Sequence, residues 1–165
     1  MRIYLIGYMG SGKSTLGCKL AKKLHIPFID MDHYIEVRNY KTIPQIFAEE
    51  GEESFRLKEQ KALKELSEFT DVVIATGGGA PCFFDNMYLM NKTGKTIYLN
   101  IDPKVLAYRL MHSKTERPLI KGKSKEELIR FIDESLKKRL AYYKKAQVEI
   151  TDPDLPMEKF LLLIQ

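Results

Sequence analysis

The stretch that most restricts the fold of this chain is "GYMGSGKS", residues 7–14. It follows the apolar run Ile3–Ile6 and opens a segment in which Leu16, Leu20 and Leu24 recur at helical spacing. A glycine-rich loop of the form G-x-x-x-x-G-K-S/T, placed between a strand and a helix, is typical of nucleotide-binding proteins. The sequence therefore predicts a strand, a phosphate loop and a helix in succession, and with them an α/β fold that binds a nucleotide.

The residue types in this loop suit phosphate chemistry. Glycines let backbone N–H groups converge on phosphate oxygens, and the N-terminus of the following helix adds positive potential. Lys13 is placed to reach the β- and γ-phosphates, and the hydroxyl of Ser14 is placed to bind Mg²⁺. We therefore expect a nucleoside triphosphate, with Mg²⁺ as the cofactor.

The rest of the chain repeats this alternation of short apolar runs and helical patterns. Further strands are expected at residues 27–32, 72–75, 96–101 and 148–151. Helices are expected at 32–69 with breaks near Pro44 and Gly51, and at 85–94, 103–112, 124–146 and 157–164. Strands too apolar to face water, alternating with helices, are typical of a parallel sheet covered on both faces. The predicted fold is three-layer α/β/α, with ligands at the carboxyl ends of the strands.

Two helix ends carry recognisable signals. Gly94 is expected to end the 85–94 helix in the left-handed conformation that glycine favours. Ser124 and Glu127 have the spacing of a capping box at the start of the 124–146 helix.

The composition fits one compact domain spanning residues 1–165. Apolar residues make up 44% of the chain, and 27 Lys and Arg against 22 Asp and Glu give a net charge of +5. No window is basic enough to predict nucleic-acid binding, whereas a small polyanionic substrate needs only a few cations. Cys18 and Cys82 match no metal or redox spacing, and no apolar run approaches the roughly 20 residues that cross a bilayer. We expect a cytoplasmic, monomeric protein with reduced cysteines, no nucleic-acid partner and no membrane association.

Asp30 and Asp32, in "DMD", follow the second predicted strand. If the chain is still extended there, both carboxylates point to one side, toward the ligand edge of the sheet. One would then hold the water shell of the metal, and the other would meet an acceptor hydroxyl. Asp30 is the predicted metal contact, because the third strand, "VVIAT", lacks the acidic residue that usually ends it in phosphate-loop proteins. Asp32 has an alternative role as the N-cap of the helix that follows.

The base of the nucleotide is predicted to be adenine. A guanine-nucleotide switch carries N-K-x-D, in which the carboxylate pairs with guanine. "NKTG", at 91–94, begins like that motif but ends in glycine, so the carboxylate is missing. The sequence therefore favours ATP over GTP.

Three consecutive glycines, Gly77, Gly78 and Gly79, follow the third predicted strand. A tight turn needs only one or two glycines, so the run points to a further requirement. Without Cβ atoms the backbone can closely approach a flat ring and offer N–H groups to its oxygens. Because this strand end lies beside the phosphate loop, the triplet is predicted to bind the acceptor, with a simple turn as the alternative.

Several short motifs occur in a specific order, namely "GYMGSGKST", "DMD", "FR", "TGGGA", "RPL" and "RLAYYKKA". In this order and spacing, from Ile3 to about Asp152, the chain resembles the shikimate kinases. The resemblance implies a P-loop kinase fold similar to that of nucleoside monophosphate kinases, with five parallel strands in the order 2-3-1-4-5. It also implies transfer of the γ-phosphate of ATP to the 3-hydroxyl of shikimate, in the pathway to chorismate and the aromatic amino acids.

Carried over position by position, the resemblance implies three groups of site residues. The implied catalytic residues are Lys13, Asp32 as candidate base, and Arg117 on a mobile lid loop at 112–124. The implied ATP-binding residues are Gly10, Ser11, Gly12, Lys13, Ser14, Thr15, Arg109, Arg117 and Pro156. The implied substrate-binding residues are Asp32, Arg56, Gly77, Gly78, Gly79 and Arg139, with a helical segment at 32–60 against shikimate. The expected metal contacts are Ser14 and Asp30.

The two substrate-binding arginines suit this role, because a guanidinium binds a carboxylate with two parallel hydrogen bonds. Arg56 and Arg139 match the family arginines that hold the shikimate carboxylate. Arg56 has a further possible role, compatible with the first, in a salt bridge to Glu59 or Glu53. The alternative for Arg139 is the solvated face of the basic helix "KKRLAYYKK".

The sequence departs from the family pattern at two places. Ala141 stands where the motif that begins at Arg139 usually has proline, although Tyr143 keeps the expected aromatic residue. "TDPDLPME" lacks the arginine that some members place beside adenine, which leaves Arg109 and Pro156 to sandwich the base.

Two other functions fit part of this pattern. A kinase of another small acceptor, such as gluconate or a nucleoside monophosphate, would share the scaffold, and gluconate also carries a carboxylate. A non-catalytic module that binds ATP or nucleic acid would retain the phosphate loop. Against that module, Lys13, Ser14, Asp32 and Arg117 together favour an enzyme.

Overall fold

The computed structural model of the chain describes residues 1–114 and 120–165. In these residues a five-stranded sheet has the order β2-β3-β1-β4-β5, with every neighbouring pair parallel, as the family resemblance implied. The strands are β1 (Arg2–Ile6), β2 (Phe28–Asp30), β3 (Val72–Ala75), β4 (Lys95–Leu99) and β5 (Val148–Ile150). The helices are α1 (Lys13–Leu24), α2 (Met31–Asn39), α3 (Ile43–Leu66), α4 (Asn86–Thr93), α5 (Pro103–Met111), α6 (Lys125–Tyr143) and α7 (Met157–Ile164), with a 3₁₀ turn η1 (Ala80–Cys82).

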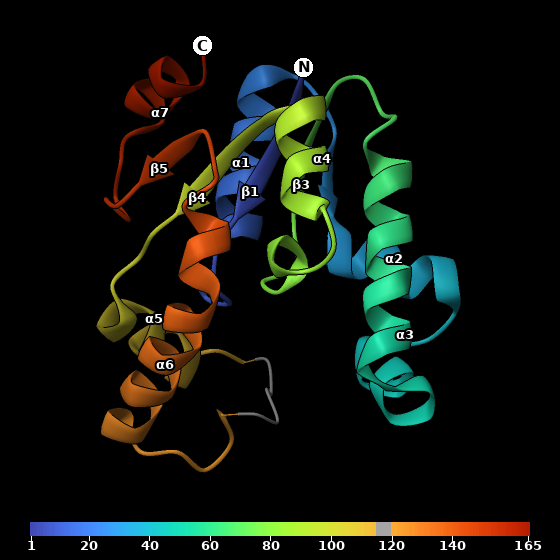
Figure 1. Ribbon diagram of the computed structural model, residues 1–165. Coiled ribbons are helices and arrows are strands. Elements are labelled where there is room, and N and C mark those ends of the chain that lie inside the picture. Colours follow the sequence, from blue (N-terminus) through green and yellow to red (C-terminus); the bar gives the residue numbers. More distant parts are fainter. Residues whose placement is uncertain (115–119) are drawn as a thin grey trace.

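The side-chain alternation of β1 divides the core between the two faces of the sheet. Ile3 and Leu5 pack in one apolar cluster with buried residues of α1, α5, α6 and α7. Tyr4 and Ile6 pack in the other cluster, with buried residues of α2, α3 and α4. Figure 1 shows helices on both sides of the sheet, so the prediction of a three-layer α/β/α fold is confirmed.

The carboxyl ends of the strands face the part of the molecule where the predicted site lies. Figure 1 shows that α3 and α6 both extend past this edge on opposite sides, whereas the two chain termini lie at the other end of the molecule. Residues carried by α3, by α6 and by the loops after β1, β2 and β3 can therefore meet at one place. Among the described residues, no helix is both long enough and apolar enough to cross a membrane.

The predicted breaks in the 32–69 helical stretch are present. α2 ends at Asn39, and α3 begins with a capping box in which the Thr42 hydroxyl accepts from the Gln45 amide and the Gln45 side chain accepts from the Thr42 amide. Gly51, at φ 84°, interrupts α3 with a non-helical residue. Because left-handed backbone is strained for residues with a Cβ, glycine suits this break.

The prediction for Gly94 was wrong. It follows α4 with φ −169°, which is extended backbone, so it does not form a left-handed cap. The reason for glycine here is close packing: a Cβ would lie 2.5 Å from the carbonyl oxygen of Arg2. At the start of α6, the Ser124 hydroxyl accepts from the amide of Glu127, which is the Ser124 half of the predicted capping box.

Candidate active site

The phosphate loop connects β1 to α1 at the carboxyl edge of the sheet. Gly10 and Gly12 adopt φ of 81° and 95°, conformations that are strained for other residues. Gly12 is the N-cap of α1 and has no side chain that could accept from the amide groups of the first turn. Those amides are available to donate to an anion, as is required of a helix N-terminus that binds phosphate.

The Lys13 ammonium is folded back over the loop that precedes it. Nζ donates to the carbonyl oxygen of Gly7 at 2.6 Å and to that of Tyr8 at 3.0 Å. These bonds hold the positive charge above the loop, where the phosphates of a nucleotide would lie.

Ser14 and Asp30 meet, although they come from different elements. The Ser14 hydroxyl donates to Oδ2 of Asp30 at 2.8 Å. Hydroxyl and carboxylate oxygens are the hard ligands that Mg²⁺ prefers, and Mg²⁺ usually takes only one or two protein oxygens, with water and phosphate completing its shell. The pair therefore fits the predicted metal site.

The predicted extended conformation is present at Asp30 but was wrong for Asp32. β2 ends at Asp30, and α2 begins at Met31. Asp30, and not Asp32, is the N-cap, because its Oδ1 accepts from the amide of His33 at 3.2 Å. Asp32 lies in the first turn of α2, and the helix turns its carboxylate toward the glycine turn after β3. Because the helix begins between them, Asp30 contacts Ser14 of the phosphate loop, whereas Asp32 lies against Gly77.

The glycine turn, which we define as Gly77 to Gly79, is surrounded closely by charged side chains. A Cβ on Gly77 would lie 2.9 Å from Oδ1 of Asp32 and 3.0 Å from Oε2 of Glu59. A Cβ on Gly78 would lie 3.1 Å from Nη1 of Arg139. On Gly79 it would lie 2.7 Å from both terminal nitrogens of Arg56.

Close approach, and not backbone conformation, explains the three glycines. The glycine turn has no residue with positive φ, unlike Gly10 and Gly12 of the phosphate loop. Thr76, just before the turn, donates from its amide and its hydroxyl to the carbonyl oxygen of Leu5. After the turn, the side-chain amide of Asn86 donates to the carbonyl oxygen of Ala80 at 2.9 Å. The turn is therefore anchored at both ends while its backbone stays accessible to its charged neighbours.

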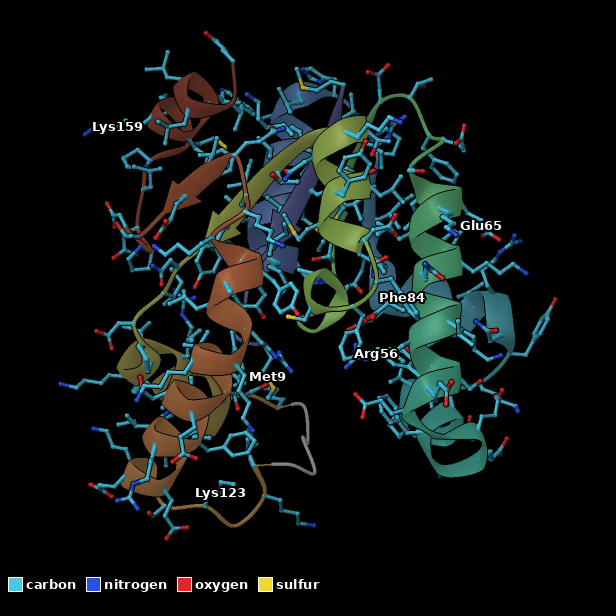
Figure 2. All side chains as sticks on the ribbon, viewed as in Figure 1. Met9, Arg56, Glu65, Phe84, Lys123 and Lys159 are labelled. Atoms are coloured by element: carbon cyan, nitrogen blue, oxygen red, sulfur yellow. The ribbon has the colours of Figure 1, made fainter. Side chains whose placement is uncertain are left out.

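Arg56 is held in place by a buried carboxylate and by an aromatic ring. Nη1 donates to Oε1 of Glu59 at 2.9 Å, and Glu59 is only 1% exposed. The guanidinium carbon lies 4.0 Å from the centre of the Phe83 ring. The salt bridge expected with Glu59 is present, and the second carboxylate near Arg56 is that of Glu52, at 3.5 Å. Figure 2 shows Arg56 projecting from α3 toward the side on which Met9 of the phosphate loop lies.

The pKa of Glu59 is raised to about 7: burial is the largest cause, Arg56 and Arg139 oppose the shift, and the nearby Asp32 carboxylate adds to it. Desolvation thus outweighs the attraction of two guanidinium groups. Glu59 is therefore a titratable group at the centre of the charged cluster.

Arg139 does not belong to the solvated face of α6. It is half-buried, and its guanidinium carbon lies 5.3 Å from the centre of the Tyr8 ring, whereas Lys137 and Lys138 are exposed. Arg56 from α3 and Arg139 from α6 thus flank the glycine turn from opposite sides. That arrangement suits an anionic ligand on the turn.

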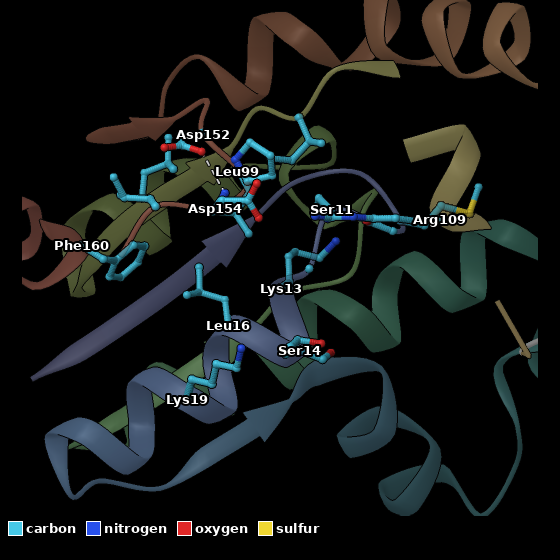
Figure 3. Close-up of a pocket in the computed structure, with 18 of the residues that line it drawn as sticks. Ser11, Lys13, Ser14, Leu16, Lys19, Leu99, Arg109, Asp152, Asp154 and Phe160 are labelled. Atoms are coloured by element: carbon cyan, nitrogen blue, oxygen red, sulfur yellow. Dashed lines mark hydrogen bonds between the residues drawn. The ribbon is translucent and has the colours of Figure 1, made fainter. Parts of the chain in front are cut away.

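A cavity of ≈ 890 Å³ runs from the phosphate loop toward the C-terminal segment. It is lined by the loop from Met9 onward, by Asp30, Asp32 and Gly78, and by Asp152 to Leu155. Figure 3 shows Lys13 and Ser14 at this cavity, with Asp152 and Asp154 on another wall. Arg109 also lines it and donates from Nη1 to the carbonyl oxygen of Gly10 at 3.1 Å.

Two residues that the sequence predicted for the site are not among the described residues that meet here. Pro156 is the exposed N-cap of α7 and is not among the described residues that line the cavity, where Pro153 lies instead. Arg117 lies outside the described residues. Asp152 to Leu155 line the cavity, although Pro156 was the only residue of "TDPDLPME" predicted to contact the base. Thr76 lines it as well, although only the glycines of "TGGGA" were predicted to bind a ligand.

Comparisons with known proteins agree with this geometry. The family model described as shikimate kinase matches residues 9–163. A shikimate kinase of Bacteroides fragilis is 56% identical over 146 residues, which cover 88% of this chain and 82% of that protein.

Solved structures give the same result. The crystal structure of shikimate kinase from Bacteroides thetaiotaomicron superposes with a TM-score of 0.93 and 47% identity, covering 99% of both chains. Shikimate kinase from Acinetobacter baumannii in complex with shikimate gives a TM-score of 0.85 and 36% identity, over 99% of this chain and 92% of that one. On these matches, this chain belongs to the shikimate kinase family.

Proposed function

We propose that this member of the shikimate kinase family binds ATP along the phosphate loop and shikimate on the glycine turn, and transfers the γ-phosphate to the 3-hydroxyl. One observation carries the proposal. Arg56 and Arg139 flank the glycine turn, and Asp32 lies against the same turn next to the phosphate loop. A flat, hydroxylated carboxylate such as shikimate matches that set of groups, because two guanidinium groups can bind its carboxylate and an aspartate can accept from its hydroxyls.

The donor side of the site uses the phosphate loop. The amides from Gly10 to Thr15 surround the phosphates, and Lys13 offsets their negative charge. Arg109, held beside the loop through Gly10, packs against the base, and Pro156 is proposed as its partner on the other side. These groups attract the phosphates electrostatically. Because they are positioned before the nucleotide binds, little free energy is lost in reorganising them.

Ser14 and Asp30 are the residues that would hold Mg²⁺, Ser14 directly and Asp30 through water. When bound, Mg²⁺ neutralises charge on the β- and γ-phosphates. Asp30 also holds the Ser14 hydroxyl in the orientation needed for this contact.

Asp32 orients the acceptor hydroxyl. Its carboxylate lies beside the glycine turn, which holds the ring, and next to the phosphate loop. Because phosphoryl transfer passes through a loose transition state, alignment of the hydroxyl contributes more than its early deprotonation. Asp32 therefore acts first by positioning and accepts the proton late.

The chain is proposed to act as one kinase domain that has a shikimate-binding segment and a mobile lid. The segment 32–60 carries Asp32 and Arg56 and forms the shikimate side of the site. The loop 112–124 serves as a lid that brings Arg117 onto the transferring phosphate and excludes water.

We also propose that the protein is a cytoplasmic monomer. The residues assigned to ATP and shikimate all come from one chain, so the site needs no second subunit. The thiols of Cys18 and Cys82 are both free, which suits a reducing compartment.

A coupled assay of ADP release with three acceptors tests the proposed function. With ATP and Mg²⁺, we expect shikimate to give turnover at least about 10²-fold faster than gluconate or AMP, because only shikimate matches both arginines and the turn. Lys13→Ala, purified in parallel, controls for a contaminating kinase. Preference for gluconate or AMP would assign another acceptor, and ATP binding without turnover on any acceptor would indicate a non-catalytic module.

A further inference from the structure

Tyr143 is a buried side chain that the reaction proposed above does not use. It is the last residue of α6 and is fully buried. Its hydroxyl donates to the carbonyl oxygen of Gly78 at 2.5 Å. Gly78 is the residue of the glycine turn that lies against Arg139. A single hydrogen bond therefore joins the end of α6 to the middle of the turn.

Arg139 and Tyr143 lie on the same face of α6, because they are four residues apart. The Arg139 guanidinium is close enough to Tyr143 to lower the pKa of its hydroxyl, but burial has the larger effect and raises that pKa well above its usual range. The phenol thus stays protonated and serves as a donor. One face of α6 meets Gly78 twice, once through each side chain.

The ring of Tyr143 is fixed as well as its hydroxyl. It packs against the ring of Tyr98 on β4, with 5.0 Å between the ring centres and 42° between the planes. Both rings belong to the apolar cluster on one face of the sheet. Because its ring is held against β4, Tyr143 can fix the position of the glycine turn relative to the sheet.

We propose that Tyr143 is a positioning residue for the acceptor, and that it fixes the separation between the glycine turn and Arg139. This inference rests on the proposed function, in which shikimate lies on the glycine turn and its carboxylate binds Arg139. Without the hydroxyl, the Gly78 carbonyl loses the hydrogen bond that joins the turn to α6. The carboxylate of shikimate would then meet Arg139 and the turn at a less well-defined distance.

The test compares Tyr143→Phe with Tyr98→Phe. Each variant loses one hydroxyl from the same aromatic pair, and the Tyr98 hydroxyl donates to Asn100 at 3.3 Å, away from the glycine turn. For Tyr143→Phe we expect the KM for shikimate to rise about 5- to 10-fold, with kcat and the KM for ATP within about 2-fold. For Tyr98→Phe, all three constants should stay within about 2-fold of those of the wild type.

A purely structural role would lower the melting temperature and the active fraction, and hence kcat, but would leave the KM for shikimate unchanged. An unchanged KM for shikimate in Tyr143→Phe therefore overturns this inference, as does an equal rise in both variants. If the wild-type protein releases no ADP with shikimate, the proposed function fails and this inference fails with it. That result is distinguishable, because it appears before either variant is compared.

Discussion

The guanidinium of Arg56 donates from Nη1 to Oε1 of Glu59 at 2.9 Å, and the carboxyl group that receives this bond is almost completely buried. The bond aims the guanidinium at Gly79 and stacks it on the ring of Phe83. A surface arginine could adopt many rotamers, whereas this one is fixed before substrate arrives. Holding Arg56 in this way requires burial of the Glu59 carboxyl group, which is unfavourable for its charged form and raises its pKa to about 7.

The first prediction concerns the pH dependence of stability. The pKa of Glu59 rises from 4.5 to about 7 in the folded protein, so folding takes up a proton between these values. The stability that this group contributes is full below the unfolded pKa and is lost as pH rises through the folded pKa. Glu59→Gln, which cannot titrate, should therefore lack this loss.

Urea unfolding of both proteins at about pH 5 and about pH 8 measures this effect. The free energy of unfolding of the wild type, relative to that of Glu59→Gln, should fall by on the order of 1–3 kcal/mol between the two pH values. Parallel pH profiles for the two proteins would contradict a raised pKa of Glu59.

The second prediction concerns the glycine turn. Gly78→Ala puts a methyl group 3.1 Å from Arg139, and Gly79→Ala puts one 2.7 Å from Arg56. Both contacts meet the far ends of long side chains and not the backbone, so the protein should fold with its guanidinium groups displaced. The KM for shikimate should rise about tenfold in Gly78→Ala, and more in Gly79→Ala, while the KM for ATP barely changes. A larger effect on ATP than on shikimate would leave the triplet as a turn only.

The third prediction concerns Asp32. Asp32→Asn keeps the shape of the side chain but removes the charge that orients the acceptor hydroxyl. Turnover should fall at least about 10²-fold, with ATP affinity nearly intact. Steady-state kinetics and a binding titration with ATP measure the two effects separately. Wild-type turnover in the variant would exclude Asp32 from the reaction.

The fourth prediction concerns Arg139, with its neighbour Lys138 as the matched control. Arg139→Ala removes a guanidinium beside Gly78, and it should raise the KM for shikimate by on the order of 10²-fold, well beyond its effect on ATP. Lys138→Ala removes a charge from the exposed side of α6 and should leave both KM values unchanged. Equal effects of Arg139→Ala on both substrates would count against a role in binding the carboxylate.

Local patterns were enough to predict the phosphate loop and the class of fold. The glycines, Lys13 and Ser14 lie in one short stretch, and the periodicity of the flanking segments sets their secondary structure. The apolar strands likewise indicated a sheet buried on both faces. These features depend on neighbours in the sequence, so the sequence displays them directly.

Local patterns did not predict where α2 starts. "DMD" reads as the end of a strand, but the Asp30 carboxylate accepts from the amide of His33, and the helix starts at Met31, one residue before the predicted start at 32. A one-residue change in that boundary decides which way Asp32 points. Short elements leave such boundaries to tertiary packing, which a single sequence does not reveal.

The contact between Tyr143 and Gly78 could not be predicted either. The two residues are 65 positions apart, and the acceptor is a backbone carbonyl, which every residue possesses. The glycine triplet signalled close approach but did not identify the neighbours. Only the fold brings α3, α6 and the turn after β3 together.

The most direct test of the proposed reaction is the identity of its product. The wild-type protein is incubated with ATP, Mg²⁺ and shikimate, and the products are followed by ³¹P NMR. The account predicts one new phosphate monoester, on the 3-hydroxyl of shikimate, formed in equal amount with ADP. ADP accompanied only by inorganic phosphate, or a monoester on a different hydroxyl, would contradict it.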